Sequence, residues 1–303
     1  MASNVPGPGP TVAGCDNRRV PSIEDILTIE RIDDDIYRGG VFPSVLRRTF
    51  GGQVAGQALV AATKTVAPEF AVHSLHGYFL RPGKADQPAI FLVDRIRDGR
   101  SFVTRRVTGV QNGEAIFSMS ASFHVTGDEG LEHQDAVPPA VDPETLLDRR
   151  DVGSDAERSL FQEWENFDIR IVPRDQLVLA GGLAAQQRVW FRYRHALPDD
   201  QLLHVCTLAY MSDMTLLSSA KVPHPGARAQ TASLDHAMWF LRPFRTDDWL
   251  LYDQTSPSSS GGRSLTQGRI FDRAGRMVAA VTQEGLTRTN VPADQVSIMK
   301  ADS

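Results

Sequence analysis

The chain contains an internal repeat, which constrains the fold strongly because both copies must build similar units. The segment LHGYFLRPGKADQPAIFLVDRIRDGRSF (75–102) resembles HAMWFLRPFRTDDWLLYDQTSPSSSGGRSL (236–265). Each copy has an aromatic pair followed by Leu-Arg-Pro and, further on, Gly-Arg-Ser. The sequence therefore predicts two related units in tandem. Because Arg81 and Arg242 recur in both copies, we expect structural roles for them in preference to ligand contacts.

Each half has the pattern of one long helix and several antiparallel strands. The runs QNGEAIFSMSASF (111–123) and RAGRMVAAVTQEG (273–285) follow a turn ending in Gly with alternating, largely apolar residues, as the return strand of a hairpin does. The runs TFGGQVAGQALVAATKTV (49–66) and LAYMSDMTLLSSA (208–220) match each other and are too long and too rich in Ala and Leu for strands. We predict an α+β fold in which a sheet wraps a central helix in each half. The expected elements lie near 27–38, 52–67, 71–82, 88–97, 100–111 and 114–125, and then near 166–172, 186–195, 202–220, 229–242, 248–256, 262–272 and 276–288.

The two halves are flanked and separated by segments of different composition. Residues 1–21 are rich in Pro and Gly and predict a disordered tail, and residues 292–303 form a second tail. Residues 126–165 are acidic and Pro-rich, so we expect a linker with one short helix near 143–149 and no contribution to a core.

Composition excludes several classes of protein. The 303 residues are 41% hydrophobic and 23% charged with a net charge of −5, which is average for a globular protein and argues against a nucleic-acid surface. Only two cysteines are present, Cys15 and Cys206, and we find neither an apolar run of about 18 residues nor a signal peptide. We therefore expect a cytosolic protein without stable membrane insertion. The metal, P-loop, dinucleotide and nucleophile-elbow motifs are absent as well.

Several separated motifs resemble the type II, TesB-like acyl-CoA thioesterases, which have a double-hotdog fold. They are GGQVAGQAL, HSLHGYFLRPG, PDDQLLHVCTLAYMSD, SLDHAMWFLRPF and VTQEG, in that order, and the resemblance spans about 22–290. It implies an N-terminal hotdog at 22–125 and a C-terminal hotdog at 166–291 that carries the catalytic residues. It also implies hydrolysis of acyl-CoA to fatty acid and coenzyme A, no cofactor, and a homo-oligomer (dimer or tetramer). The two sheets should then join into one antiparallel sheet with both long helices on the same side.

Asp213 interrupts the run LAYMSDMTLL, which otherwise has the pattern of a buried helix face. A buried carboxylate is unfavourable unless it is paired, hydrogen-bonded or protonated, so its position needs a reason beyond packing. The pair Ser212-Asp213 could cap a helix that starts there. However, matching the two helical runs places Asp213 where the first half has Gln53, and a cap would be expected in both copies. The asymmetry favours a functional carboxylate.

Two more polar residues complete the candidate site, and their roles come from the resemblance. Gln283 continues a strand face that begins with Met277, and by itself it would fit the polar end of a strand. It nevertheless matches the active-site glutamine of the family. Ser233 stands where the family has a hydroxyl residue. The resemblance implies that Asp213, Ser233 and Gln283 hold one water against the thioester carbonyl, with Asp213 as general base and no covalent acyl-enzyme.

Other residues and other functions remain open at this stage. The adjacent Asp235 and His236 should point to opposite faces of a strand, so structural roles are expected for them. Backbone N–H groups near Gly51 and Gly52 are candidates for stabilising an oxyanion. A hotdog acyl-CoA hydratase or dehydratase is disfavoured because no histidine follows Asp213 until His224. A non-catalytic acyl-CoA sensor should lack the polar triad.

Overall fold

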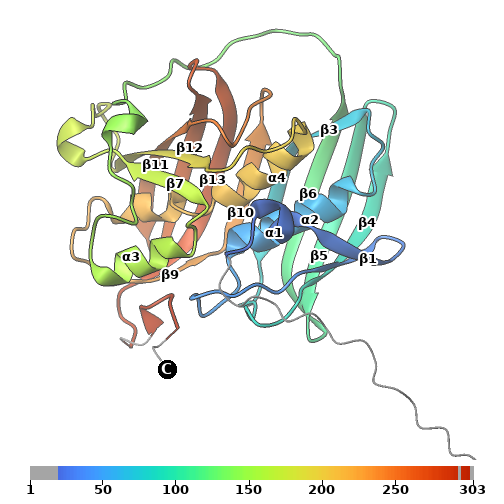
Figure 1. Ribbon diagram of the computed structural model, residues 1–303, viewed down its shortest axis with the longest axis horizontal. Helices are drawn as coiled ribbons and strands as arrows, with labels where there is room; N and C mark the ends of the chain where they lie inside the picture. The colour runs from blue at the N-terminus through green and yellow to red at the C-terminus, as the bar shows by residue number, and fades with distance from the viewer. Residues whose placement is uncertain (1–19, 293–294, 301–303) are drawn as a thin grey trace, which may run out of the picture.

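The computed structural model describes residues 20–292 and 295–300, and within these ranges the strands form one antiparallel sheet (Figure 1). The sheet has 13 strands in the order β1-β2-β4-β5-β6-β3-β10-β13-β12-β11-β8-β7, with β9 paired to β13. The first half contains α1 (Ile23–Leu27), β1 (Ile29–Asp33), β2 (Ile36–Gly39), α2 (Gly51–Thr63), β3 (Phe70–Phe79), β4 (Ile90–Asp98), β5 (Phe102–Gln111) and β6 (Glu114–Val125). The second contains β7 (Phe167–Ile171), β8 (Gln186–Tyr193), α4 (Gln201–Met211), η3 (Leu216–Lys221), β9 (Gln230–Ser233), β10 (Asp235–Phe240), β11 (Leu250–Ser260), β12 (Arg263–Asp272) and β13 (Met277–Arg288).

The halves are joined through β3 and β10, which pair antiparallel at the centre of the sheet. The sheet curves around α2 and α4, which lie side by side on the same side of it (Figure 1). Apolar residues from both helices and both halves of the sheet form one shared core. The predicted continuous sheet with two helices on one side is therefore confirmed.

The two helices approach closely because small residues face the contact. A Cβ atom on Gly52 would lie 2.2 Å from the carbonyl oxygen of Tyr210, and one on Gly56 would lie 3.4 Å from the carbonyl oxygen of Cys206. Any side chain at Gly52 would push the N-terminus of α2 away from the C-terminal end of α4. The GGQVAG motif thus fixes how the two halves meet.

The predicted second helix, 202–220, is wrong in its length. The helix α4 ends at Met211 with Ser212 as its C-cap, and a turn leads from there into the 3₁₀ helix η3. Asp213 lies in this turn, two residues past α4, whereas Gln53 is the third residue of α2. The match of Asp213 with Gln53 therefore fails, and the argument from asymmetry fails with it.

The segment between the halves is more structured than its composition suggested. A 3₁₀ turn, η1 (Pro143–Thr145), falls inside the expected 143–149, but the helix α3 (Asp155–Gln162) was not expected. A reciprocal capping box between Ser154 and Glu157 starts α3. The expectation that this segment supplies no core is wrong, because Leu146 packs with Trp190 and other buried side chains of the second half.

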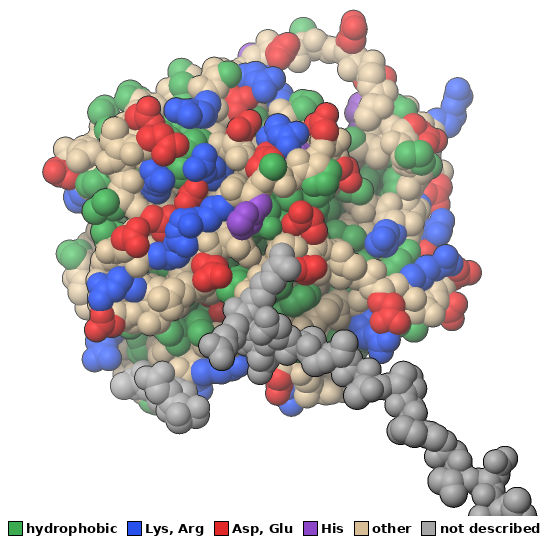
Figure 2. Space-filling model, viewed as in Figure 1, with side chains coloured by type: hydrophobic (Ala, Val, Ile, Leu, Met, Phe, Trp, Pro, Cys, Tyr) green, Lys and Arg blue, Asp and Glu red, His purple; other side chains and the backbone are tan. Residues whose placement is uncertain are grey.

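The predicted tails are described only in part. Of the N-terminal tail 1–21, residues 1–19 lie outside the described residues, and so does Cys15. Near the C-terminus, Met299 forms a β-bridge with Leu46, and Lys300 donates from its backbone N–H to the carbonyl oxygen of Val45. Positive and negative side chains are interspersed over the face shown in Figure 2. No helix among the described residues is long and apolar enough to span a membrane.

Candidate active site

Asp213 lies where the second half of the chain meets the first turn of α2. The backbone N–H of Gly52 donates to its carboxylate, and a Cβ atom on Gly51 would lie only 2.5 Å from Asp213 Oδ2. The N-cap residue of α2, Phe50, offers no side-chain acceptor of its own. Asp213 therefore caps a helix, but the helix belongs to the other half, and the positive end of its dipole favours the carboxylate.

The turn that carries Asp213 is held from strand β11. The hydroxyl of Tyr252 donates to the backbone oxygen of Ser212 (3.2 Å), and the amide of Gln254 donates to Thr215 Oγ1 (2.7 Å). All of these side chains except the carboxylate itself are buried. The turn is thus fixed on both sides of Asp213, which gives the carboxylate a defined position.

Ser233 and Gln283 converge on the same carboxylate from the sheet. The Ser233 hydroxyl donates to Asp213 Oδ1 (3.1 Å), and Gln283 Nε2 donates to Asp213 Oδ1 (3.0 Å) and to Ser233 Oγ (2.6 Å). Gln283 is completely buried on the inner face of β13, as the alternation of that strand predicted. The three residues singled out from the sequence therefore form one hydrogen-bonded cluster.

A bulge between β9 and β10 makes this convergence possible. Ser233 pairs with Gly285, but Ala237 pairs with Thr282, so five residues on β9–β10 (233–237) lie opposite four on β13 (282–285). In a regular strand, Ser233 and His236 would point to opposite faces because they are three positions apart. The extra residue lets Ser233 point to the same face as His236, toward Gln283.

His236 belongs to the cluster, although the sequence indicated only a structural role for it. Its Nδ1 lies 2.9 Å from Gln283 Oε1, its Nε2 lies 2.8 Å from Ser212 Oγ, and the residue is 1% exposed. The inward parity of β10, shared with Met238, was a signal that could have placed it beside the glutamine. Ser212 gave no comparable signal, since only the fold brings it to the imidazole.

Burial dominates the electrostatics of the cluster. It raises the pKa of Asp213, while attraction to His236, the hydrogen bonds from Gln283 and Ser233, and that from Gly52 act in the opposite direction. Burial also lowers the pKa of His236, against the attraction of Asp213. A carboxylate with a raised pKa is a stronger base than a free aspartate, which suits proton abstraction from water.

The neighbouring Asp235 points away from this cluster, as expected. It accepts from the backbone N–H of Glu284 (2.6 Å) and lies 3.2 Å from His76 Nε2. The two repeat arginines also make the expected structural contacts: Arg81 donates to the carbonyl of Ala115 (2.8 Å), and Arg242 donates to that of Met277 (2.9 Å). Each arginine therefore ties its strand to the start of the next return strand.

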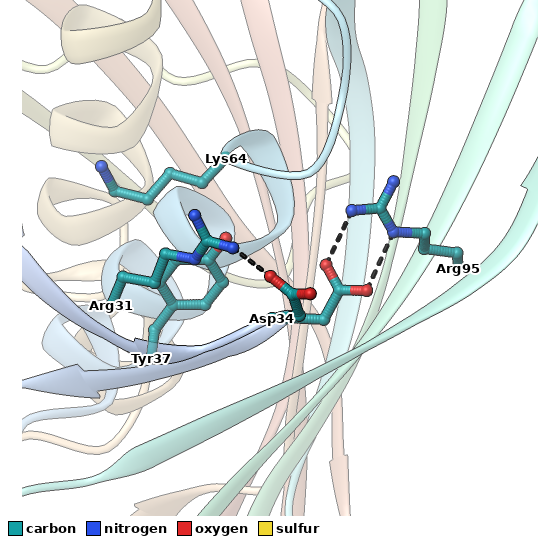
Figure 3. A pocket seen from close by; sticks show the side chains of 6 residues that line it. Arg31, Asp34, Tyr37, Lys64 and Arg95 are labelled. Carbon is teal, nitrogen blue, oxygen red and sulfur yellow. Dashed lines mark hydrogen bonds and ion pairs between the residues drawn. The ribbon is translucent and has the colours of Figure 1, made fainter.

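A polar surface hollow lies elsewhere, beside Lys64 at the C-terminal end of α2 (Figure 3). Its charged side chains pair with each other, as Arg31 does with Asp34 and Arg95 with Asp35. Since α2 has 13 residues, its two ends are roughly 20 Å apart. The hollow is therefore separate from Asp213. Among the described residues, no group of three or more His, Cys, Asp or Glu side chains could hold a metal ion.

Comparison with known proteins gives the same family for both halves. Residues 41–124 match the profile of the acyl-CoA thioesterase N-terminal domain, and residues 158–286 match that of acyl-CoA thioesterase. Acyl-coenzyme A thioesterase 8 of Mus musculus is 38% identical over 283 residues, which cover 88% of each chain. The crystal structure of acyl-CoA thioesterase II TesB2 from Mycobacterium marinum has 57% identity and a TM-score of 0.80, and the match covers 90% of this chain and all of that one. A hot dog fold protein from Alicyclobacillus acidocaldarius, at 20% identity and a TM-score of 0.70, covers 89% of this chain and 98% of its own and supports the fold alone.

The fold is thus a double hotdog, with a sheet from two repeats around two central helices. The chain belongs to the acyl-CoA thioesterase family, in its TesB-like branch, and is an enzyme of the thioesterase class.

Proposed function

We propose that the protein hydrolyses fatty acyl-CoA to a free fatty acid and coenzyme A, with one water activated by Asp213, Ser233 and Gln283. The observation that carries this proposal is the convergence of Ser233 and Gln283, from two strands, on the partly buried carboxylate of Asp213, which lies in a turn. The family membership of the chain supports the choice of a thioester as substrate.

The carboxylate has capacity left for a water. A carboxylate offers about four acceptor sites. Three are taken by the Ser233 hydroxyl, the Gln283 amide and the Gly52 N–H, which leaves about one for a water proton. A water bound there can also bond Ser233 Oγ, so its oxygen is held in a defined direction. Orientation of this kind lowers the barrier without a cofactor.

The reaction then proceeds by direct attack. The water oxygen forms a bond to the thioester carbonyl carbon while its proton passes to Asp213. Collapse of the tetrahedral intermediate breaks the C–S bond, and the proton on Asp213 passes to the departing thiolate. The residue ends as it began, so no covalent acyl-enzyme is needed.

The oxyanion donors suggested from the sequence need revision. The N–H of Gly52 is directed at Asp213, so it serves the base rather than the carbonyl oxygen. Gly51, the first residue of α2, has a backbone N–H that a helix does not use internally, and we retain it as the candidate donor.

The test is the release of thiol from palmitoyl-CoA, followed with a thiol reagent. Hydrolysis gives stoichiometric thiol and palmitate. A hydratase would act without freeing thiol, and a non-catalytic sensor would bind palmitoyl-CoA and leave it intact, so either result would contradict the proposal. The homo-oligomeric state remains a prediction, which light scattering tests against the 33.3 kDa monomer.

A further inference from the structure

The carboxamide of Gln283 must be held in one of two orientations that have almost the same shape. Its nitrogen now faces Asp213 Oδ1 and Ser233 Oγ, and its oxygen faces His236 Nδ1. If the group turned over, its oxygen would face an ionised carboxylate that can only accept hydrogen bonds. The water-binding arrangement therefore requires a donor on the oxygen side of the amide.

We propose that His236, supported by Ser212, is a positioning residue that holds the Gln283 amide with its NH₂ toward Asp213. For this role the imidazole must carry its proton on Nδ1, where it donates to Gln283 Oε1 at 2.9 Å. The opposite tautomer would place two acceptors against each other and release the amide. This role rests on the proposed hydrolytic function, because it acts on the same water.

Ser212 can support that tautomer, because its single hydroxyl proton can be donated to His236 Nε2 or to the Ala209 carbonyl. Its hydroxyl lies 2.8 Å from His236 Nε2 and 3.0 Å from the carbonyl oxygen of Ala209. With a neutral imidazole, the hydroxyl donates to Nε2 and leaves the proton on Nδ1. With a protonated imidazole, it accepts from Nε2 and donates to Ala209. The ring position and the bond to Gln283 are the same in both states, so the support does not depend on the charge of His236.

The contacts form a closed ring. It runs from Ser212 to His236, from His236 to Gln283 and from Gln283 to Asp213, and the last residue is bonded covalently to Ser212. The ring closes because β10 and β13 are in register, with Ala237 opposite Thr282, so that the preceding His236 faces Gln283 across the two strands. Small displacements of positioned groups cost up to ~10² in rate, so a break in this ring should reduce turnover while leaving acyl-CoA binding largely intact.

The test uses His236→Leu, which removes the donor, and His236→Asn, whose amide NH₂ can replace Nδ1–H. Each is made in the wild-type chain and in the Gln283→Ala variant. The matched control is His204→Leu, which changes another buried histidine whose Nδ1 contacts Thr246 instead of the cluster. We expect His236→Leu to lower kcat by about 10–100-fold with little change in KM, and His236→Asn to recover part of the loss.

The decisive measurement is coupling. If His236 acts through Gln283, then His236→Leu has almost no further effect on kcat in the Gln283→Ala variant, whereas His204→Leu has the same effect in both backgrounds. Equal effects of His236→Leu in both backgrounds would refute the positioning role. Wild-type turnover in Gln283→Ala itself, or no hydrolysis by the unmodified protein, would instead refute the proposed function.

The protonation state of His236 can be measured without any variant, so the inference can be tested even if the variants fail to fold. Nitrogen-15 NMR of the histidine rings in the unmodified protein should show His236 with a protonated Nδ1. A neutral ring protonated on Nε2 would overturn the inference, whatever the variants do.

Discussion

Replacing Asp213 with asparagine separates catalysis from stability. The change removes one partly buried charge and keeps the shape of the side chain. The raised pKa of Asp213 means that burial outweighs its hydrogen bonds from Gln283, Ser233 and Gly52, so the neutral form is the easier one to bury. Against this gain, the new NH₂ group must face one of those donors, which costs about 1–3 kcal/mol for an unmatched polar group.

These opposing effects should leave the free energy of unfolding within ~1 kcal/mol of the unmodified protein, or about 2–4 °C in Tm. Loss of a general base costs ~10²–10⁴ in rate, which corresponds to roughly 3–5 kcal/mol of transition-state stabilisation. The loss of activity should therefore greatly exceed any loss of stability. Acyl-CoA affinity should persist, since the substitution keeps the shape of the side chain.

The assay is kcat/KM with palmitoyl-CoA, together with Tm and binding of the intact substrate. Asp235→Asn is the matched control, because Asp235 undergoes the same chemical change two positions from Ser233 but points away from the cluster. A folded Asp213→Asn variant that turns over at the wild-type rate would refute the role of the base. So would an equal loss of activity in the control.

Three further predictions follow from the same contacts. Because burial raises the pKa of Asp213, the acid limb of the kcat/KM–pH profile should have its midpoint above 3.8, the ordinary value for aspartate. The stability that the protonated Asp213 contributes to the fold should be lost as the pH rises from 3.8 through the raised pKa. A kcat/KM that stays constant down to pH 3.8, or a stability relative to Asp213→Asn that increases with pH above 3.8, would contradict these expectations. Gly51→Ala should reduce turnover and lower Tm, since its Cβ would meet Asp213 Oδ2 and displace the carboxylate that caps α2; kcat and Tm measured together test this, and unchanged kcat would show that the contact is dispensable. Ser233→Ala should lower kcat by up to ~10², whereas Ser233→Thr, which keeps the hydroxyl and restricts its rotation, should remain active. A higher kcat for Ser233→Ala than for Ser233→Thr would contradict the role of the hydroxyl.

Local patterns were sufficient for most of the strands. The alternation in MVAAVTQEG predicted β13 and the inward direction of Gln283, because a strand that faces a core on one side must alternate with period two. The repeat of FLRP predicted structural roles for Arg81 and Arg242, and both donate to the backbone of a neighbouring strand. The alternation depends on residues that are close in sequence, and the repeat is found by comparing the chain with itself, so the sequence contains both directly.

The position of Asp213 could not be obtained in that way. Its partner Gly52 lies far along the chain, and the contact exists only because small residues let α2 and α4 approach. The end of α4 at Met211 was missed because the apolar pattern continues through the turn into η3. The bulge at β9–β10 was missed because a single extra residue hardly changes a hydrophobic pattern, although it reverses the face of every later side chain.

The location of the cluster has a consequence for the two repeats. Asp213, Ser233, Gln283 and His236 all come from the second half, but the helix end that stabilises the carboxylate comes from the first. In a single half, Asp213 would lose the hydrogen bond from Gly52, and the first turn of α2 would lose its acceptor. Under the proposed function the repeats therefore differ in role: one supplies the proposed reacting side chains, and the other supplies the dipole and the glycines that let the carboxylate approach it.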